Sequence, residues 1–142
     1  MTSIYIPRKL RERVAEQASY RCGYCLSLER ITGFVMEIDH LIPQILGGPT
    51  VEENLWLACS ACNTFKGYRI SALDPESGEI VRLFNPREQS WPEHFHWIDA
   101  GARMVGRTAT GRATVAALHL NRPVLVRARR SWIEAGWHPP AD

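Results

Sequence analysis

Apolar side chains near the start of the chain recur every four residues, at Leu10, Val14 and Ala18. This spacing lines them up on one face of a helix. Pro7 suits the first turn of that helix, because proline has no N–H and the N–H groups of a first turn lack helical partners. The pattern therefore predicts a helix within residues 1–21.

A different pattern follows, in which apolar side chains at Phe34, Met36 and Ile38 alternate with other residues. A period of two is typical of a half-buried strand, so we predict a strand over residues 34–38. The pair Asp39-His40 stands directly after this run, and a segment rich in proline and glycine then turns the chain away. Two ionisable side chains are thus expected at the end of a strand.

Three short elements are expected after that turn. Thr50-Val-Glu-Glu53 has the form of a capping box for one helical turn, and Leu55-Trp-Leu-Ala58 predicts a second strand. The segment NTFKGYRI, which follows Cys62, can form a helix with Asn63 and Lys66 on one face. The predicted order is therefore strand, loop, strand, helix.

Residues 71–142 combine strands and helices in another order. We predict a strand in GEIVRLFNP, a strand pair in WPEHFHWIDA and ARMVGRTAT, and helices in RATVAALHL after Gly111 and in PVLVRARRSWIEAG. The fold class is therefore predicted to be α+β. The 142 residues, 45% of them hydrophobic, suffice for one compact core and are too few for two. We expect a single domain over residues 1–142, with an N-terminal helix in 1–21, a core in 22–70 and a C-terminal extension in 71–142.

No apolar run approaches the length of a membrane span. The N-terminal sequence MTSIYIPRKLRERV also turns basic before it could form the apolar core of a secretory signal. These features predict a cytoplasmic protein with no membrane partner. A cytoplasmic location bears on the cysteines, because the reducing cytosol disfavours disulfides.

The net charge of +2 hides an uneven distribution of charged side chains. Residues 1–30 carry six basic and three acidic side chains, residues 31–99 carry four and ten, and residues 100–142 carry seven and two. Two positive ends around a negative middle are expected if the middle binds a cation and the ends bind a polyanion. A merely solvated surface explains the same distribution equally well.

All four cysteines fall in two CxxC pairs, Cys22-Gly-Tyr-Cys25 and Cys59-Ser-Ala-Cys62. Four thiolates from two short turns can complete a tetrahedral shell around a structural Zn²⁺. Two disulfides and a redox-active CxxC are the alternatives, but a cytoplasmic location disfavours the first and the duplicated pair disfavours the second. We therefore predict a zinc site that joins the two ends of the intervening segment.

That intervening segment contains side chains suited to hydrolysis. If the two strands form a hairpin and the following helix packs across it, Asp39, His40 and Asn63 can converge. Oxygens of Asp and Asn suit Mg²⁺ or Mn²⁺ better than Zn²⁺, and a neutral histidine beside such an ion can take a proton from water. A metal on phosphate oxygens together with a base that activates water is a minimal set for cleaving a phosphodiester. The alternative is that Asp39 only caps a turn and His40 only fills a polar pocket.

The stretch IDHLIPQILGG…NLWLACSACNTFKG resembles the HNH endonuclease motif, in the version bracketed by two zinc-binding CxxC pairs. Residues 22–67 carry the motif. The resemblance continues through LFNPREQSWPEHFHW and GRTATGRATVAALHLNR, which are similar to the tail of short stand-alone bacterial HNH proteins. It implies a ββα-metal (His-Me finger) core with a structural zinc site of four cysteines, extended by a C-terminal strand pair and helices.

The resemblance also implies roles for individual residues. His40 matches the first motif histidine, the general base, and Asp39 matches the acidic metal ligand. Asn54 matches the middle asparagine, which braces the loop that carries the histidine. Asn63 stands where many members have a second histidine, so that Asp39 and Asn63 would hold Mg²⁺ or Mn²⁺ as the catalytic metal. Lys66 matches a recurrent lysine that contacts phosphate.

The implied activity is metal-dependent hydrolysis of DNA phosphodiesters. The resemblance assigns the structural Zn²⁺ to four ligands, namely Cys22, Cys25, Cys59 and Cys62. The competing function is a non-catalytic zinc module that binds nucleic acid. Such a module has no use for Asp39, His40 and Asn63 together, which favours the endonuclease.

The segment from Arg103 to Arg130 contains seven arginines and no acidic side chain. A stretch of this kind can follow a DNA backbone, and we expect Arg127, Arg129 and Arg130 to contact phosphates. The alternative is that these arginines form the polar face of packed helices.

Overall fold

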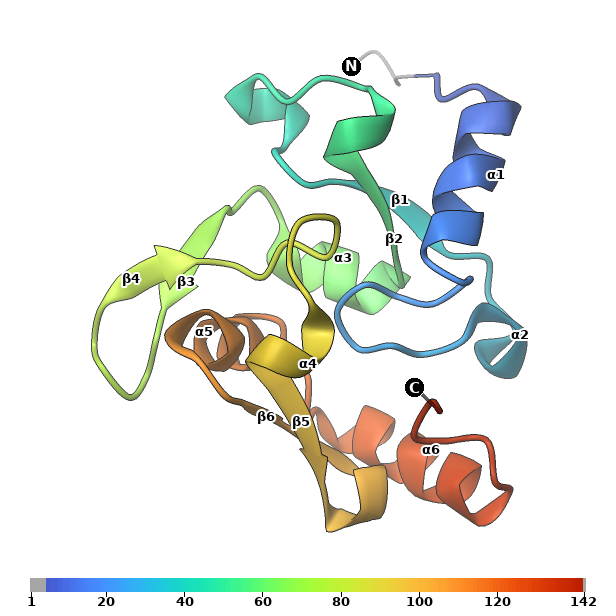
Figure 1. The fold of residues 1–142 in the computed structure, drawn as a ribbon, viewed down its shortest axis with the longest axis vertical. Helices are drawn as coiled ribbons and strands as arrows, with labels where there is room; N and C mark the ends of the chain where they lie inside the picture. Colours follow the sequence, from blue (N-terminus) through green and yellow to red (C-terminus); the bar gives the residue numbers. More distant parts are fainter. Residues whose placement is uncertain (1–4, 142) are drawn as a thin grey trace. The chain divides into compact units, whose positions relative to one another are not determined.

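The computed structural model describes residues 5–141 of the chain. Helices and short strands are mixed along this part, in agreement with the predicted α+β class (Figure 1). The backbone divides into two compact units. The first runs to Ile70 and includes Asn85–Glu88, and the second comprises Ser71–Phe84 and the chain from Gln89 onward. The single domain expected over residues 1–142 stays a prediction, and its residues 1–4 and 142 lie outside the described part.

The first unit begins with a helix that carries one apolar face. Its helices and strands are α1 (Arg8–Gln17), α2 (Glu29–Thr32), β1 (Glu37–His40), β2 (Leu55–Ala58) and α3 (Ser60–Lys66) (Figure 1). Pro7 stands at the N-cap of α1, and the helix buries Val14 and Ala15 where it packs against β2. Ala18, which ends the predicted apolar face, is the C-cap and is also buried. The four-residue spacing therefore predicted this helix and its buried side.

The strands β1 and β2 form an antiparallel hairpin, in which Asp39 pairs with Trp56 and His40 pairs with Leu55. The strand predicted over Leu55–Ala58 is therefore confirmed. Because successive side chains of a strand point to opposite faces, Asp39 and His40 lie on opposite faces of β1. One strand thus presents two neighbouring ionisable groups to two different environments.

The bounds predicted for the first strand, residues 34–38, were wrong. Phe34 and Val35 are 77% and 82% exposed and stand before the paired segment. The strand starts only at Glu37, because Ala58, its partner, is the last residue of β2. The alternating apolar run at residues 34–38 therefore begins three residues before the paired strand.

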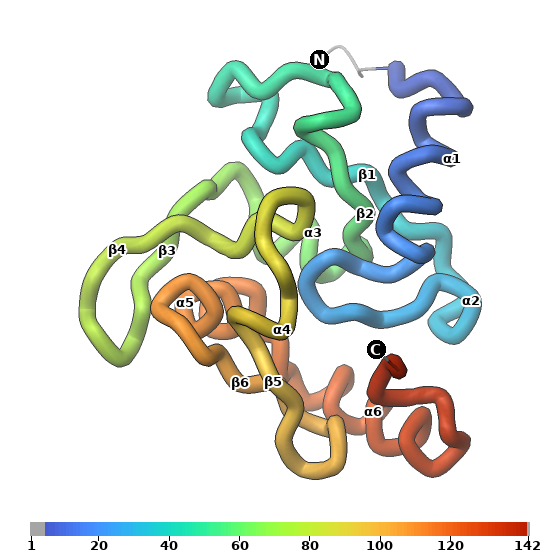
Figure 2. Tube along the Cα trace, viewed as in Figure 1, coloured from blue at the N-terminus to red at the C-terminus, as the bar shows by residue number. Residues whose placement is uncertain are grey.

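A loop over residues 41–54 connects the two strands and extends beyond the end of the hairpin (Figure 2). It contains two short 3-10 helices, η1 (Gln44–Leu46) and η2 (Glu52–Asn54). The capping box predicted from Thr50 was wrong, because Val51 occupies the N-cap of η2 and makes no side-chain cap hydrogen bond. The hydroxyl of Thr50 contacts His40 instead.

The helix α3 includes the first part of the predicted segment NTFKGYRI. It begins at Ser60, because the Cys59 sulfur accepts a hydrogen bond from the backbone N–H of Cys62 and so caps the helix. It ends at Lys66, since Gly67 adopts a positive φ of 59°. The second cysteine pair is therefore built into the first turn of α3.

The core of the first unit combines side chains of α1, the first cysteine turn and the hairpin. Arg87 fastens the segment Asn85–Glu88 to this unit by donating to the Leu55 carbonyl oxygen at 3.1 and 2.9 Å. Its guanidinium also lies 5.0 Å from the ring centroid of Trp56. The largest contributions to this core come from buried apolar residues, namely Val14, Tyr24, Met36, Leu41, Leu55 and Leu57.

The second unit contains two antiparallel strand pairs, the first formed by β3 (Ser71–Leu73) and β4 (Ile80–Arg82) and the second by β5 (Phe95–Ile98) and β6 (Arg103–Gly106). The second pair was predicted, and it turns at the 3-10 helix η3 (Asp99–Gly101). The start predicted for its first strand was wrong, because Trp91–His94 forms a helix and the strand begins at Phe95. The strand predicted in GEIVRLFNP is present as β4, whereas its partner β3 was not predicted. Asp74 stabilises the turn between β3 and β4, because its carboxylate accepts from two backbone N–H groups and from Arg112.

Three helices complete the second unit, namely α4 (Trp91–His94), α5 (Ala109–Ala117) and α6 (Pro123–Glu134). The start predicted for α5, after Gly111, was wrong. The Thr108 hydroxyl caps the helix by accepting from the Gly111 N–H, so Gly111 lies inside the first turn. A Cβ at Gly111 would lie 2.0 Å from the His94 carbonyl oxygen, so only glycine permits this close packing. None of the helices within residues 5–141 is long and apolar enough to span a membrane.

Candidate functional site

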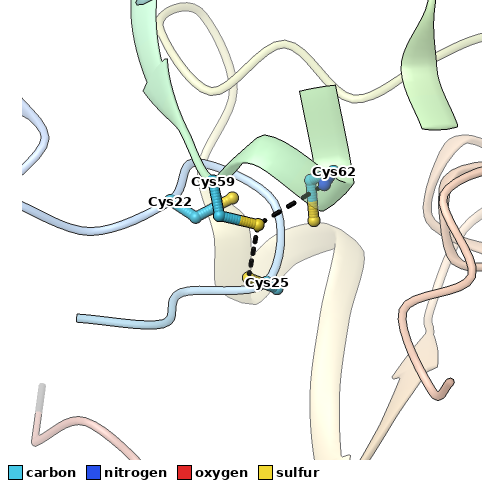
Figure 3. A group of neighbouring side chains, drawn as sticks. All are labelled: Cys22, Cys25, Cys59 and Cys62. Atoms are coloured by element: carbon cyan, nitrogen blue, oxygen red, sulfur yellow. Dashed lines mark hydrogen bonds between the residues drawn. The ribbon is translucent and has the colours of Figure 1, made fainter. Parts of the chain in front are cut away.

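The four cysteines converge as their spacing predicted. Cys22 and Cys25 come from the turn after α1, and Cys59 and Cys62 come from the start of α3 (Figure 3). Their sulfur atoms all lie within 4.8 Å of one another, and the Cys25 and Cys59 sulfurs are 3.8 Å apart. Four sulfurs about 2.3 Å from a tetrahedral zinc would be separated by about 3.8 Å. The group could therefore hold a metal ion such as zinc.

The chemistry of the four sulfurs also fits a cation. All four cysteines are free thiols, so the alternative with two disulfides does not describe this structure. Burial raises the pKa of Cys22 well above its ordinary value, whereas hydrogen bonds from Cys22, Cys59 and Cys62 lower the pKa of Cys25. Several thiolates in one buried space repel one another, and a bound cation would remove that repulsion.

Asp39 is buried in a network of charged and polar groups. Its Oδ2 accepts a hydrogen bond of 2.6 Å from the Tyr24 hydroxyl, and its Oδ1 accepts one of 3.0 Å from Lys66 Nζ. Burial, and then the charge of Asp39, raise the pKa of Tyr24, so the phenol stays protonated and donates. Lys66 also donates to the carbonyl oxygens of His40 and Leu41. The network therefore ties α3 to the end of β1.

A second pair of side chains joins the same two elements. Glu37 lies two residues before Asp39 and so on the same face of β1, and its Oε1 accepts a 2.8 Å hydrogen bond from Asn63 Nδ2. A carboxylate can only accept, so Glu37 fixes which end of the Asn63 carboxamide faces it. The Asn63 Oδ1 is thereby directed away from Glu37. Asn63 thus contacts Glu37 directly, and its predicted convergence with Asp39 and His40 stays a prediction.

His40 lies on the other face of β1 and is partly exposed. Its Nε2 is 2.9 Å from the Thr50 hydroxyl, which also accepts from Gln44 Nε2 at 3.3 Å. Burial lowers the pKa of His40; the charge of Asp39 opposes this effect and the charge of Lys66 adds to it. The imidazole is therefore neutral at neutral pH and retains one ring nitrogen, Nδ1, for other contacts.

Asn54 fixes the loop that follows His40. Its Oδ1 accepts from the Ile42 N–H at 2.8 Å, and its Nδ2 donates to the carbonyl oxygens of Ile42 and Pro49 at 3.0 and 2.9 Å. Its own carbonyl oxygen accepts from the Leu41 N–H at 2.8 Å. Asn54 is only 7% exposed, so these bonds are shielded from water. The contacts of this one residue hold both ends of the loop together.

This geometry agrees with a comparison of the sequence with protein families. The family model for HNH endonuclease matches residues 22–69, which begin at the first cysteine pair and end just after α3. Residues 22–69 are therefore similar to HNH endonucleases, and we call them the HNH domain. Such a match suggests nuclease activity.

A relative extends the similarity beyond the HNH domain. The chain is 30% identical over 122 residues to the Septu protein PtuB of Bacillus mycoides (strain KBAB4), an alignment that covers 68% of this chain and 41% of the relative. The chain therefore spans about two fifths of the length of the curated relative that it matches. No solved structure matches the chain significantly.

Two of the residues predicted to contact DNA do not have the exposure for that role. In the HNH domain, Lys66 is 2% exposed, because it is used by Asp39 and two carbonyl oxygens. In the second unit, Arg129 is fully buried, donates to the Ala102 carbonyl oxygen at 3.2 Å and stacks over Trp97. Both predictions are corrected to structural roles.

The other two predicted DNA contacts, Arg127 and Arg130, lie on α6 with their side chains exposed. The helical repeat explains the difference from Arg129, because one side of α6 faces the core of the second unit and the other faces solvent. A run of arginines in the sequence therefore contains both structural and accessible members.

Three contributors to the site of the HNH domain were missed from the sequence. They are Tyr24, Glu37 and Thr50, which contact Asp39, Asn63 and His40 respectively. Glu37 could have been found, because the period of two along a strand places it on the face of Asp39. The roles of Tyr24 and Thr50 depend on how two distant turns fold back onto the hairpin, and no local spacing indicates them.

Proposed function

We propose that the chain is a metal-dependent endonuclease that hydrolyses DNA phosphodiesters, with His40 as the general base. The observation that supports this most strongly is that neighbouring residues of β1 lie on opposite faces of the strand. Asp39 and Glu37 face α3 and its oxygen and nitrogen groups, while His40 lies on the opposite face with one ring nitrogen bound to Thr50. The strand thus separates a cation-binding side from a base.

The base acts through one defined nitrogen. When Nε2 of His40 carries its proton and donates it to the Thr50 hydroxyl, Nδ1 is the acceptor. In the proposed step Nδ1 takes a proton from water as the water oxygen forms a bond to phosphorus. The phosphorus–oxygen bond to the leaving group breaks, and the leaving oxygen takes a proton from solvent. Thr50 is then a positioning residue, because its hydroxyl holds the imidazole ring at Nε2.

The oxygen donors on the opposite face of β1 suit a hard divalent ion. Asp39 supplies a carboxylate and Asn63 supplies the Oδ1 that Glu37 directs away from itself, and these are donors that Mg²⁺ or Mn²⁺ prefers. Both oxygens of Asp39 already accept a hydrogen bond but have two lone pairs each, so an ion would share Asp39 with Tyr24 and Lys66. When bound, such an ion would stabilise negative charge on the phosphate and on the leaving oxygen.

Two further assignments belong to this proposal. The four cysteines hold a structural Zn²⁺ that joins the first cysteine turn to α3, and the fit of the sulfur distances supports this. Arg127 and Arg130 contact DNA phosphates, which their exposure on α6 supports. A cytoplasmic location stays part of the same proposal.

A plasmid-nicking assay tests the function. We expect wild-type protein to convert supercoiled DNA to nicked circles with Mg²⁺ or Mn²⁺ and to stop when EDTA is added. His40→Ala purified in the same way should retain DNA binding and lose nicking. If wild-type protein binds DNA but nicks none with any of these metals, the non-catalytic binding module is the better description.

A further inference from the structure

The loop after His40 exposes apolar side chains at its tip. Ile45 and Leu46, which lie in η1, are 70% and 55% exposed. No residue from 41 to 51 carries a charged side chain. Neighbouring exposed apolar groups commonly mark a contact with a partner. We call Ile45 and Leu46 the apolar tip.

The backbone holds the apolar tip in one conformation. The carbonyl oxygen of Pro43 accepts from the N–H groups of Leu46 and Gly48 at 2.9 and 3.0 Å. Gly48 packs so closely on the loop that a Cβ there would lie 1.7 Å from the Ile42 carbonyl oxygen. Asn54 closes the base of the loop, as described above. A rigid apolar tip loses little conformational entropy when it binds, which favours a role in recognition.

The apolar tip is tied to the proposed general base through one hydroxyl. Thr50 Oγ1 lies 2.9 Å from His40 Nε2 and 3.3 Å from Gln44 Nε2, and Gln44 directly precedes Ile45 in η1. Thr50 therefore links His40 to the residue that directly precedes the tip. If His40 acts on a phosphodiester, the bases next to that phosphate are the surface that the tip meets.

We propose that Ile45 and Leu46 form a wedge that packs against a base step beside the scissile phosphate. This inference rests on the proposed nuclease function and identifies the base step as the part of the DNA that the loop contacts. Apolar side chains inserted from a minor groove unstack a base step. Residues 41–51, which include the tip, place no negative charge against the DNA, and the two carboxylates of the loop, Glu52 and Glu53, follow in η2. Pyrimidine–purine steps unstack most easily, so the wedge directs cleavage toward TA and CA steps.

The test uses DNA binding as well as cleavage. The probe is a duplex with 2-aminopurine at a TA step, whose fluorescence rises when the base unstacks. Binding is measured in the His40→Ala background, with and without Ile45→Ser and Leu46→Ser together. The matched control is Phe34→Ser with Val35→Ser, which removes a comparably exposed apolar pair that precedes β1 and lies outside the loop. Zinc content and circular dichroism verify that each protein is folded.

We expect the tip variant to bind about tenfold more weakly and to lose the rise in fluorescence. The slope of affinity against salt concentration should not change, because no phosphate contact is removed. The control pair should behave like the His40→Ala parent. With His40 restored, the tip variant should nick DNA without preference for TA and CA steps.

Equal affinity and equal fluorescence for the tip variant and its parent overturn the wedge. The same conclusion follows if the tip variant binds and nicks DNA normally but loses self-association in solution, because the tip would then be a protein interface. If the wild-type protein unstacks the probe but nicks no DNA, the wedge stands and the nuclease function fails. The two proposals therefore fail through different measurements.

Discussion

The ammonium of Lys66 lies 3.0 Å from Asp39 Oδ1, and the two side chains are only 3% and 4% exposed. A pair so well shielded from water serves the fold, because each charge compensates the other. Lys66→Met keeps most of the side-chain volume but leaves the Asp39 charge without this partner. We expect a loss of about 3–5 kcal/mol in the free energy of unfolding, measured by urea denaturation.

The double variant Lys66→Met with Asp39→Asn is the control for that prediction. It removes both charges, so it should be more stable than Lys66→Met alone. If Lys66→Met is as stable as wild type and only its affinity for DNA falls, Lys66 is a phosphate contact, as the sequence first indicated.

Removal of one cysteine tests the metal centre. Cys22→Ser should lose zinc and unfold the HNH domain, because a structural zinc contributes several kcal/mol to the folding of a small site. Metal analysis of wild-type protein should find about one zinc per chain, retained when a mild chelator removes Mg²⁺. A folded wild-type protein that contains four free thiols and no zinc contradicts the assignment.

The contact between Glu37 and Asn63 predicts a change in metal affinity. Glu37→Gln keeps the size of the side chain, but its amide can donate to Asn63 and turn the carboxamide around. We expect Mn²⁺ to bind roughly 10- to 100-fold more weakly, as is typical when the partner of a metal ligand is lost. Calorimetry on zinc-loaded protein measures this directly.

Glu53→Gln is the matched control, because Glu53 is exposed in η2 and its change removes the same charge. An equal loss of Mn²⁺ affinity in both variants would mean that net charge, rather than orientation of Asn63, controls binding.

Asp74 predicts how the second unit responds to acid. The Arg112 guanidinium beside it holds the pKa of Asp74 well below its ordinary value of about 4. A lowered pKa gives stability that is present above pH 4 and is lost as the pH falls through the folded-state value. The difference in unfolding free energy between wild type and Asp74→Asn should therefore be greatest near pH 7 and shrink below about pH 4. A difference that stays constant as the pH is lowered through this range contradicts this explanation of the ion pair.

Local patterns in the sequence predict much of the candidate site. The CxxC spacing predicted that the four cysteines come together, and the apolar run Leu55–Ala58 gave the second strand its bounds. Each CxxC pair and the apolar run are local patterns in the sequence. The resemblance to HNH endonucleases then implied roles for the polar residues of the site. Asn54 makes the contacts expected of a residue that braces the loop.

The contacts that sequence patterns did not predict depend on tertiary packing. Lys66 is a charged residue on a short helix, and only the approach of α3 to β1 shows that its ammonium is buried. Thr50 fits a capping box in sequence, but its hydroxyl contacts His40 once the loop folds back. Arg129 is likewise chemically identical to Arg127, and their different exposure depends on which side of α6 faces the core.

The rate of DNA cleavage in a single turnover, at saturating Mg²⁺, tests the role of His40 most directly. His40→Ala should cleave about 10² to 10⁴-fold more slowly than wild type, because it lacks the general base, while its DNA affinity and zinc content stay unchanged. The cleavage rate of Thr50→Val should be only about fivefold lower than that of wild type, because one hydrogen bond is lost. The cleavage rate of Thr50→Ser should return to the wild-type value. Cleavage by His40→Ala at the wild-type rate would contradict the assignment of the base.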